Sequence, residues 1–308
     1  MDVLKITPRG YCHGVVDAIK IARQVGAESK AEPVPQPVHM LGYLVHNEHV
    51  TDELHEHGVE LVDSDDRIKG LQRIDEGTVI FTAHGVSPQV VARAQEMGLR
   101  TVDATCSDVV RTHDLVKDLA ARDFHVLYIG QQGHPEPEGV IGEAPDRVHL
   151  VEPMDFAALD NIDFPTEQLG VTCQTTLSQW DTLATIEEIQ RRWPHVEVHN
   201  EICKATQERQ EAAVEAAAEV DMVVVVGSRR SSNSKRLVQV VEELGHKPAV
   251  LVDNPGELDP EWFRGIKRVG VTSGASTPTW MTRKVIEYLQ ALDPEAAPTA
   301  AGGTPLPT

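Results

Sequence analysis

Three stretches of the sequence share one pattern, in which a short apolar run leads into a cysteine and a helical pattern follows. They are ITPRGYCHGVVDAIKIA at 6–22, TVDATCSDVVRTHDLVK at 101–117 and VHNEICKATQERQEAAV at 198–214. Their cysteines, Cys12, Cys106 and Cys203, lie about 95 residues apart. Self-similarity at a fixed period is typical of repeated structural units, so the sequence predicts three similar units.

Polar clusters recur in phase with these cysteines. In each repeat a second apolar run ends in LVHN, QQGHPE or SRRSSNS, and a third ends in FTAHG, VTCQTT or VTSGAS. The residues that mark these ends are His46, His134, Asn233, His84, Thr175 and Ser276. Ligands of open α/β sheets bind outside the carboxyl ends of the strands. If the three units face one another, the thiols and these polar groups converge on one cavity.

Apolar runs alternate with helical patterns along the chain, which favours βαβ units and parallel sheets. The runs rich in Val and Ile lack strict alternation, as expected for strands that are covered on both faces. We therefore expect an α/β fold of three units with pseudo-threefold symmetry, although a length of 308 residues alone suggests about two domains. The expected domains are 1–98, 99–193 and 194–293, followed by a disordered tail at 294–308 that is rich in Pro, Ala and Gly.

Composition and charge exclude several classes of protein. The 28 Lys and Arg residues stand against 48 Asp and Glu residues, a net charge of −20, which argues against a nucleic-acid backbone as the main partner. No apolar run reaches the ~18–20 residues of a membrane helix, and the N-terminus lacks a signal-peptide pattern. We therefore expect a cytoplasmic protein that binds neither nucleic acid nor membrane.

The cysteines favour a metal centre. Four cysteines in 308 residues are too few for a disulfide framework. Three thiols that recur in phase suit a soft metal centre, either an iron–sulfur cluster or zinc. An iron–sulfur cube normally takes four cysteines, so three would leave one iron with an open position, as catalysis at a metal requires. The fourth cysteine, Cys173, occupies a place that holds Ala83 and Ser273 in the other repeats, which indicates a small strand-end residue rather than a ligand.

The histidines and hydroxyl groups at the strand ends predict an anion pocket. Imidazole N–H groups of His46, His84 and His134 can donate to phosphate oxygens. Helix N-termini after the SSN sequence at 231–233 and the GAS sequence at 274–276 add backbone N–H donors. We therefore expect phosphate or diphosphate binding. The sequence has neither a Walker A motif nor GxGxxG after a strand, which argues against ATP hydrolysis and a nicotinamide cofactor.

Two carboxylates are candidates for a general acid. Glu136 and Glu138 of GHPEPEG follow the second apolar run of the middle repeat, beside His134. The charged form of a carboxyl is disfavoured beside an electron-rich metal site and an anion, so either residue could stay protonated and deliver a proton.

Nine motifs, in this order, resemble the series that marks the IspH/LytB family of 4-hydroxy-3-methylbut-2-enyl diphosphate reductases. They are RGYCHGV, LVHN, FTAHGVS, DATCSDV, GHPEPEG, QTTLSQW, EICKATQERQ, VGSRRSSNSKRL and GVTSGASTP, and the resemblance covers about residues 3–292. It implies a trefoil of three α/β units around a central metal-cluster cavity. It also implies the last step of the non-mevalonate (MEP) isoprenoid pathway, in which an allylic alcohol diphosphate loses its hydroxyl to give isopentenyl and dimethylallyl diphosphate.

The resemblance further implies a role for each motif residue. Cys12, Cys106 and Cys203 would hold one 4Fe-4S cluster per chain, with one open iron that binds the substrate hydroxyl. Glu136 would be the proton source, and Thr175 would order the hydroxyl region. The diphosphate would be held by His46, His84, His134, Ser231, Ser232, Asn233 and Ser276. Two electrons would come from an external donor, of ferredoxin or flavodoxin type or a reductase system.

Some residues depart from the family pattern, and two other functions remain open. His13 and Ser107 follow the first two cysteines where the family usually has a small residue and Pro, and Cys173 stands where Thr is common. His13 could change the cluster potential or the hydrogen bonding to sulfur. A non-catalytic iron–sulfur electron carrier or redox sensor would explain the cysteines but neither the anion pocket nor Glu136. A zinc-dependent phosphohydrolase would explain the pocket, but three thiolates make a soft, electron-rich zinc.

Overall fold

The computed structural model describes residues 1–29, 35–64, 66–162, 164 and 168–293, which leaves the expected tail at 294–308 outside the described residues. Within the described chain, three four-stranded sheets are present, and all of their strand pairs are parallel. This confirms the predicted α/β class. No helix in these ranges has both the length and the apolar character needed to cross a membrane.

The chain divides into two compact units. One consists of Met1–Cys12, His46–Glu48 and the chain from Lys204 on, and the other consists of His13–Val45 and His49–Cys203. We call them the first and second unit and describe each by itself.

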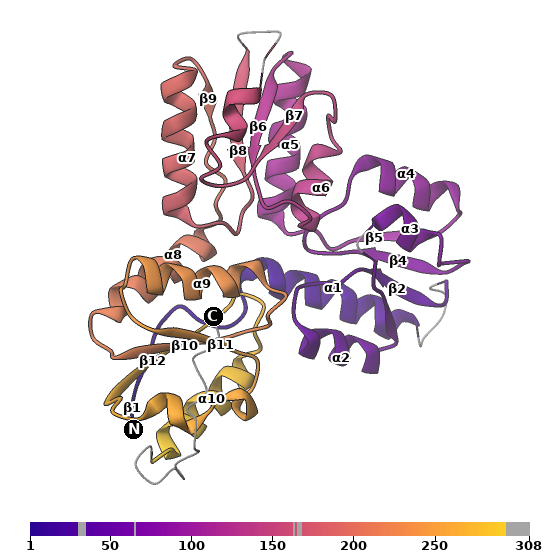
Figure 1. The fold of residues 1–308 in the computed structure, drawn as a ribbon. Helices are drawn as coiled ribbons and strands as arrows, with labels where there is room; N and C mark the ends of the chain where they lie inside the picture. Colours follow the sequence, from indigo (N-terminus) through magenta and orange to yellow (C-terminus); the bar gives the residue numbers. More distant parts are fainter. Residues whose placement is uncertain (30–34, 65, 163, 165–167, 294–308) are drawn as a thin grey trace. The chain divides into compact units, whose positions relative to one another are not determined.

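The first unit contains one sheet, in the strand order β1-β12-β10-β11 (Figure 1). Its strands are β1 (Asp2–Lys5), β10 (Met222–Val226), β11 (Ala249–Val252) and β12 (Arg268–Ser273). Its helices are α8 (Lys204–Ala217), α9 (Ser232–Glu243) and α10 (Thr279–Ala291), with short 3₁₀ turns η2 (Pro255–Glu257) and η3 (Pro260–Phe263).

Strand β10 explains why the sequence of this sheet is continuously apolar. All five of its residues, MVVVV, are buried. Val224 packs with α10 and η3 on one face, whereas Val223 and Val225 pack with α8 and α9 on the other. A strand that is covered on both faces needs apolar side chains at every position, as the sequence predicted.

The second unit contains the other two sheets. The strand order β3-β2-β4-β5 is formed by β2 (Val38–Leu41), β3 (Val59–Val62), β4 (Thr78–Phe81) and β5 (Arg100–Asp103), with helices α1 (His13–Ser29), α2 (Glu48–Glu56), α3 (Arg67–Leu71) and α4 (Pro88–Glu96). The order β7-β6-β8-β9 is formed by β6 (His125–Ile129), β7 (Val148–Val151), β8 (Leu169–Cys173) and β9 (Glu197–Val198), with helices α5 (Ser107–Ala121), α6 (Pro135–Ile141) and α7 (Gln179–Arg192) and the 3₁₀ turn η1 (Ala158–Asn161). Helices α5 and α6 cover one face of the β6 sheet and α7 covers the other (Figure 1).

The sheets are offset by one strand from the sequence repeat. The strand that opens each repeat pairs outside its own repeat: β1 with β12, β5 with β4 and β9 with β8. For β5 and β9 the connection explains the pairing. Helix α4 connects β4 to β5 and α7 connects β8 to β9, and each crossover helix returns the chain to the position beside the preceding strand. The limits 1–98, 99–193 and 194–293 therefore follow the repeat rather than the sheets, and the three-domain division stays a prediction.

Truncation of Leu127 in β6 tests the packing of the second unit. Leu127 is fully buried in a cluster with Ile129, Val171 and Ile189. We expect Leu127→Ala to lower the free energy of unfolding by about 2–5 kcal/mol, because the transfer energy is lost and a cavity remains. Urea unfolding measures this, with Leu183→Ala on α7 as the control, since Leu183 is 45% exposed. Equal losses in the two variants would contradict this packing.

Candidate functional site

The three cysteines that recur with the sequence repeat are anchored by the same backbone interaction. The N–H of Cys12 donates to the carbonyl of Ala275 at 3.1 Å, that of Cys106 to Ala83 at 3.0 Å, and that of Cys203 to Thr175 at 3.1 Å. The acceptors follow β12, β4 and β8, respectively. Each cysteine also directly precedes the first residue of a helix: α1, α5 or α8. Thiolates of cysteine are soft ligands for metal ions.

The surroundings of the cysteines separate three of them from the fourth. None of the four, all of which are described, forms a disulfide. Cys12, Cys106 and Cys203 are half-buried, whereas Cys173 is fully buried within β8. Burial raises the pKa of the Cys173 thiol to about 12, so that it stays a neutral thiol. Its setting is that of the small strand-end residue expected from the sequence.

Gly14 leaves space for the Cys106 sulfur. Gly14 lies in the first turn of α1, and an added Cβ at this position would lie 2.3 Å from Cys106 Sγ. His13 is exposed at the start of the same helix, with Nε2 3.4 Å from Asp108 Oδ2 and 3.5 Å from Ser107 Oγ. Sequence reasoning did not find the requirement for Gly14, and an effect of His13 on a cluster stays a prediction.

Helix α6 presents His134 and Glu136 at its N-terminus. His134 is the N-cap, and its Nδ1 accepts a hydrogen bond from the Glu136 backbone N–H at 3.2 Å. Because Nδ1 accepts, the neutral ring carries its proton on Nε2, which is therefore the ring atom that can donate to an anion. Pro135 occupies the first helical position, where its fixed φ angle favours the helix start.

The Glu136 carboxyl is buried and is held by Thr175. It is 1% exposed. Oε1 accepts a hydrogen bond from the Thr175 backbone N–H at 2.7 Å, and Oε2 accepts one from the Thr175 hydroxyl at 3.0 Å. Burial raises the pKa of Glu136 to about 7, although the Thr175 donors act in the opposite direction. Near neutral pH this side chain can therefore both hold and release a proton.

Burial separates the two carboxylate candidates. Glu138 lies on the same short helix but is exposed. It therefore lacks the burial that raises the pKa of Glu136. Gln174, which the sequence only placed beside Thr175, orders the preceding loop: its Oε1 accepts from the Gln131 N–H at 2.9 Å, and its Nε2 donates to the Thr176 hydroxyl at 3.1 Å.

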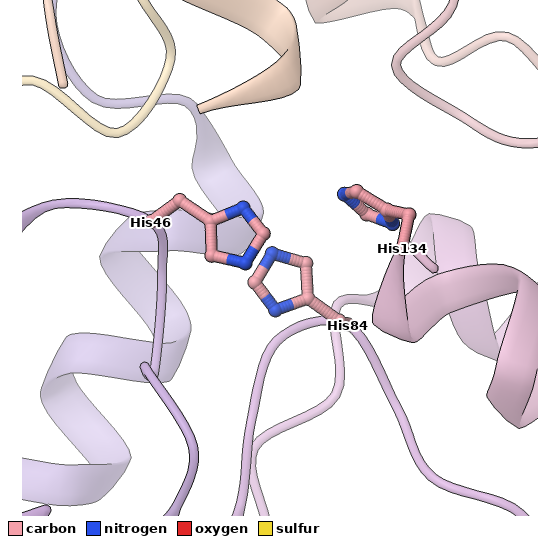
Figure 2. A group of neighbouring side chains, drawn as sticks. All are labelled: His46, His84 and His134. Atoms are coloured by element: carbon pink, nitrogen blue, oxygen red, sulfur yellow. The ribbon is translucent and has the colours of Figure 1, made fainter. Parts of the chain in front are cut away.

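His84 lies next to His134 in the second unit. Figure 2 shows their rings edge to face, with centroids 5.4 Å apart and an interplanar angle of 87°. The loop that carries His84 packs closely against His113 of α5. A Cβ added at Gly85 of this loop would lie only 2.9 Å from His113 Nε2. His113 is in turn bonded through Nδ1 to Glu143 at 2.6 Å. Sequence reasoning did not single out this His113–Glu143 pair.

The first unit brings together several predicted anion ligands. Figure 2 also labels His46, which belongs to this unit and whose backbone carbonyl accepts a hydrogen bond from the Ser276 hydroxyl at 3.4 Å. Ser231 caps α9 through the N–H of Ser234, and Ser232 is the first residue of that helix. Both polar atoms of the buried Asn233 amide have no hydrogen-bond partner among the described residues. Such orphaned groups are rare in proteins and are expected where a ligand completes the site.

Comparisons with known proteins identify the family of this chain. The family model described as LytB protein matches residues 3–290. A 4-hydroxy-3-methylbut-2-enyl diphosphate reductase of Symbiobacterium thermophilum is 56% identical, over 94% of this chain and 97% of the relative. The same enzyme of Exiguobacterium sibiricum is 53% identical, over 96% of this chain and 92% of the relative.

Two solved structures are similar as well. The E-1-hydroxy-2-methyl-but-2-enyl-4-diphosphate reductase of Plasmodium falciparum has a TM-score of 0.85 at 31% identity, over 94% of this chain and 88% of that one. A structure of (E)-4-hydroxy-3-methyl-but-2-enyl diphosphate reductase, described as the terminal enzyme of the non-mevalonate pathway, has a TM-score of 0.64 at 32% identity, over 95% of this chain and 100% of that one. The resemblance seen in the sequence motifs is thereby confirmed, and the chain belongs to the LytB family of 4-hydroxy-3-methylbut-2-enyl diphosphate reductases.

Proposed function

We propose that this chain reductively dehydroxylates (E)-4-hydroxy-3-methylbut-2-enyl diphosphate to isopentenyl and dimethylallyl diphosphate, the terminal reaction of the non-mevalonate pathway. Membership of the LytB family and identities of 50% and above over nearly the whole chain support this activity. The observation that carries the mechanism is the buried Glu136 carboxyl, held by two Thr175 donors beside His134. A protein that only carried electrons would have no use for a buried proton donor. The cytoplasmic location stays a prediction.

The cysteines fit the iron–sulfur cluster that the family implies. Three half-buried thiols directly before helices form a soft donor set, and the absence of a side chain at Gly14 makes room for the Cys106 sulfur. Cys12, Cys106 and Cys203 would hold one 4Fe-4S cluster, whose fourth iron lacks a cysteine. When bound, the cluster would supply the two electrons of the reaction, delivered by an external donor of ferredoxin or flavodoxin type or a reductase system.

The polar groups bind and orient the diphosphate in this proposal. His84 and His134 offer ring N–H donors, and the same role is assigned to His46. Asn233 offers a buried amide that no described protein group satisfies. The remaining diphosphate ligands would be Ser231, Ser232 and Ser276. An anion that accepts a hydrogen bond from the Asn233 Nδ2–H removes the cost of burying that unpaired donor, so the substrate stabilises the site that binds it.

Glu136 supplies the proton for the leaving hydroxyl. Hydroxide is a poor leaving group, so the departing oxygen must be protonated for water to leave. The O–H bond of Glu136 breaks, the proton passes to that oxygen, and the electron pair stays on the carboxylate. Thr175 holds both carboxyl oxygens and orders the hydroxyl region of the substrate.

Replacement of Glu136 tests the proton donor. Glu136→Gln keeps the size and the Thr175 contacts but has no proton to give, so we expect turnover to fall by roughly 10²–10⁴-fold. Glu138→Gln, on the same helix but exposed, is the matched control and should stay within a few-fold of the parent. In the parent, the rate should fall as pH rises through about 7, because Glu136 then loses the proton it must deliver. Near-normal rates in both variants would point to a different proton source.

Replacement of single cysteines tests the metal centre. Cys12→Ser, Cys106→Ser and Cys203→Ser should each lower the bound iron sharply and abolish turnover, because a hydroxyl is a poor ligand for a soft metal. Cys173→Ser should keep both. Iron and sulfide analysis of protein purified without oxygen measures this. Zinc in place of iron and sulfide would favour a phosphohydrolase, and loss of iron in Cys173→Ser would refute the three-thiol site.

Replacement of Gly14 tests the space beside Cys106. Gly14→Ala places a methyl group 2.3 Å from the Sγ position, which is inside van der Waals contact. The sulfur must therefore move, and we expect iron content to fall while the protein stays folded. Asp17→Ala, which changes an exposed residue of the same helix, is the control for the helix itself. Full iron content in Gly14→Ala would show that Cys106 does not need its present position.

A further inference from the structure

Tyr128 is a fully buried residue of β6 that no part of the proposed mechanism uses. Its ring lies on the face of the sheet covered by α5 and α6 and packs with Val116, Leu119 and Val140. Its hydroxyl is buried and makes no hydrogen bond of regular geometry with any described residue. A buried hydroxyl without a partner is costly, so its retention among apolar side chains calls for a physical reason.

The hydroxyl lies beside the proton donor. An added Cβ at Gly130 would come within 2.8 Å of the Tyr128 ring and within 3.0 Å of Pro137, so the ring and the first turn of α6 meet at Gly130. The hydroxyl is close enough to the Glu136 carboxyl for each group to affect the pKa of the other. Glu136 is therefore the acceptor that this hydroxyl can reach.

The other groups around Glu136 leave room for one more donor. The end of β8 supplies the two Thr175 donors, one to each carboxyl oxygen. From α5, Asp108 contributes a negative charge that disfavours the carboxylate, and from α6 itself His134 accepts from the Glu136 backbone rather than donating to its side chain. A carboxylate has about four lone-pair sites, and the two Thr175 donors occupy two of them, so it can accept a third hydrogen bond. Such a bond stabilises the charged carboxylate more than the neutral carboxyl.

We infer that Tyr128 is a positioning residue for Glu136, whose hydroxyl donates a hydrogen bond to the carboxylate that remains after Glu136 has released its proton. The inference rests on the proposed role of Glu136 as proton donor. Tyr128 keeps its own proton throughout, because burial and the neighbouring carboxylate raise the pKa of the phenol well above its ordinary value. Its contribution is to stabilise the product side of the proton transfer.

The test compares pH profiles of kcat in the cluster-loaded protein. Tyr128→Phe removes only the hydroxyl, so the carboxylate loses a donor and Glu136 keeps its proton to higher pH. We expect the falling limb of the profile to move up by about half to one pH unit, the size of one net hydrogen bond, with iron content and KM unchanged. Tyr288→Phe, a partly buried tyrosine of the first unit, is the matched control and should not move the limb.

A second replacement reverses the sign of the effect. Site-specific 3-fluorotyrosine at position 128 is a stronger donor and should move the falling limb to lower pH. A purely structural role of the ring would give no shift in either variant, which would overturn the inference. This failure is distinct from a failure of the proposed function. If Glu136→Gln loses turnover and Tyr128→Phe leaves the falling limb in place, only the role of Tyr128 is rejected. If Glu136→Gln turns over normally, the role of Glu136 as proton donor is rejected.

The carboxyl can also be observed without turnover. In the loaded protein without substrate, the infrared band of the protonated Glu136 carboxyl is identified by its absence in Glu136→Gln. Its disappearance with rising pH should occur at higher pH in Tyr128→Phe than in the parent. An identical titration in the two proteins would contradict the hydrogen bond from Tyr128.

Discussion

A single backbone hydrogen bond, made three times, positions the cysteines of this protein. The N–H of each of Cys12, Cys106 and Cys203 is held by a carbonyl just beyond the end of a strand. The carboxyl ends of parallel strands share one edge of their sheet, so this bond places each thiol at the edge where ligands of α/β proteins bind. Each cysteine also directly precedes a helix. A small change in any of the three loops would therefore move one of the thiols proposed to bind the cluster.

Two buried polar groups, one in each compact unit, are in states that cost free energy. Burial disfavours the charged form of Glu136, and the amide of Asn233 is buried without a protein partner. Both arrangements work against folding. In the proposed function, Glu136 would use its state as a proton donor near neutral pH, and Asn233 would use its state as a ligand for an anion. The surrounding apolar sheets supply the stability that makes these local costs tolerable.

Much of this could be predicted from the sequence, because the repeat and the motifs encode local structure. The cysteines, the strand-end histidines and the parallel sheets all follow from short patterns that recur in phase. The membership of β1, β5 and β9 in their sheets could not be predicted, since a repeat fixes the order of elements but not which strands pair. Gly14 and His113 were also missed, because each acts through a contact between residues far apart in the sequence.

Side-chain chemistry alone could not separate Glu136 from Glu138. Both lie in one PEPE segment, and either could have been the acid on chemical grounds. The structure separates them by burial alone: one carboxyl faces the end of β8 and the other faces solvent. Burial depends on how α6 packs on its sheet, which is set by residues such as Val140 and Tyr128 that carry no catalytic signal themselves. The raised pKa of Glu136 is therefore a property of the packing around β6.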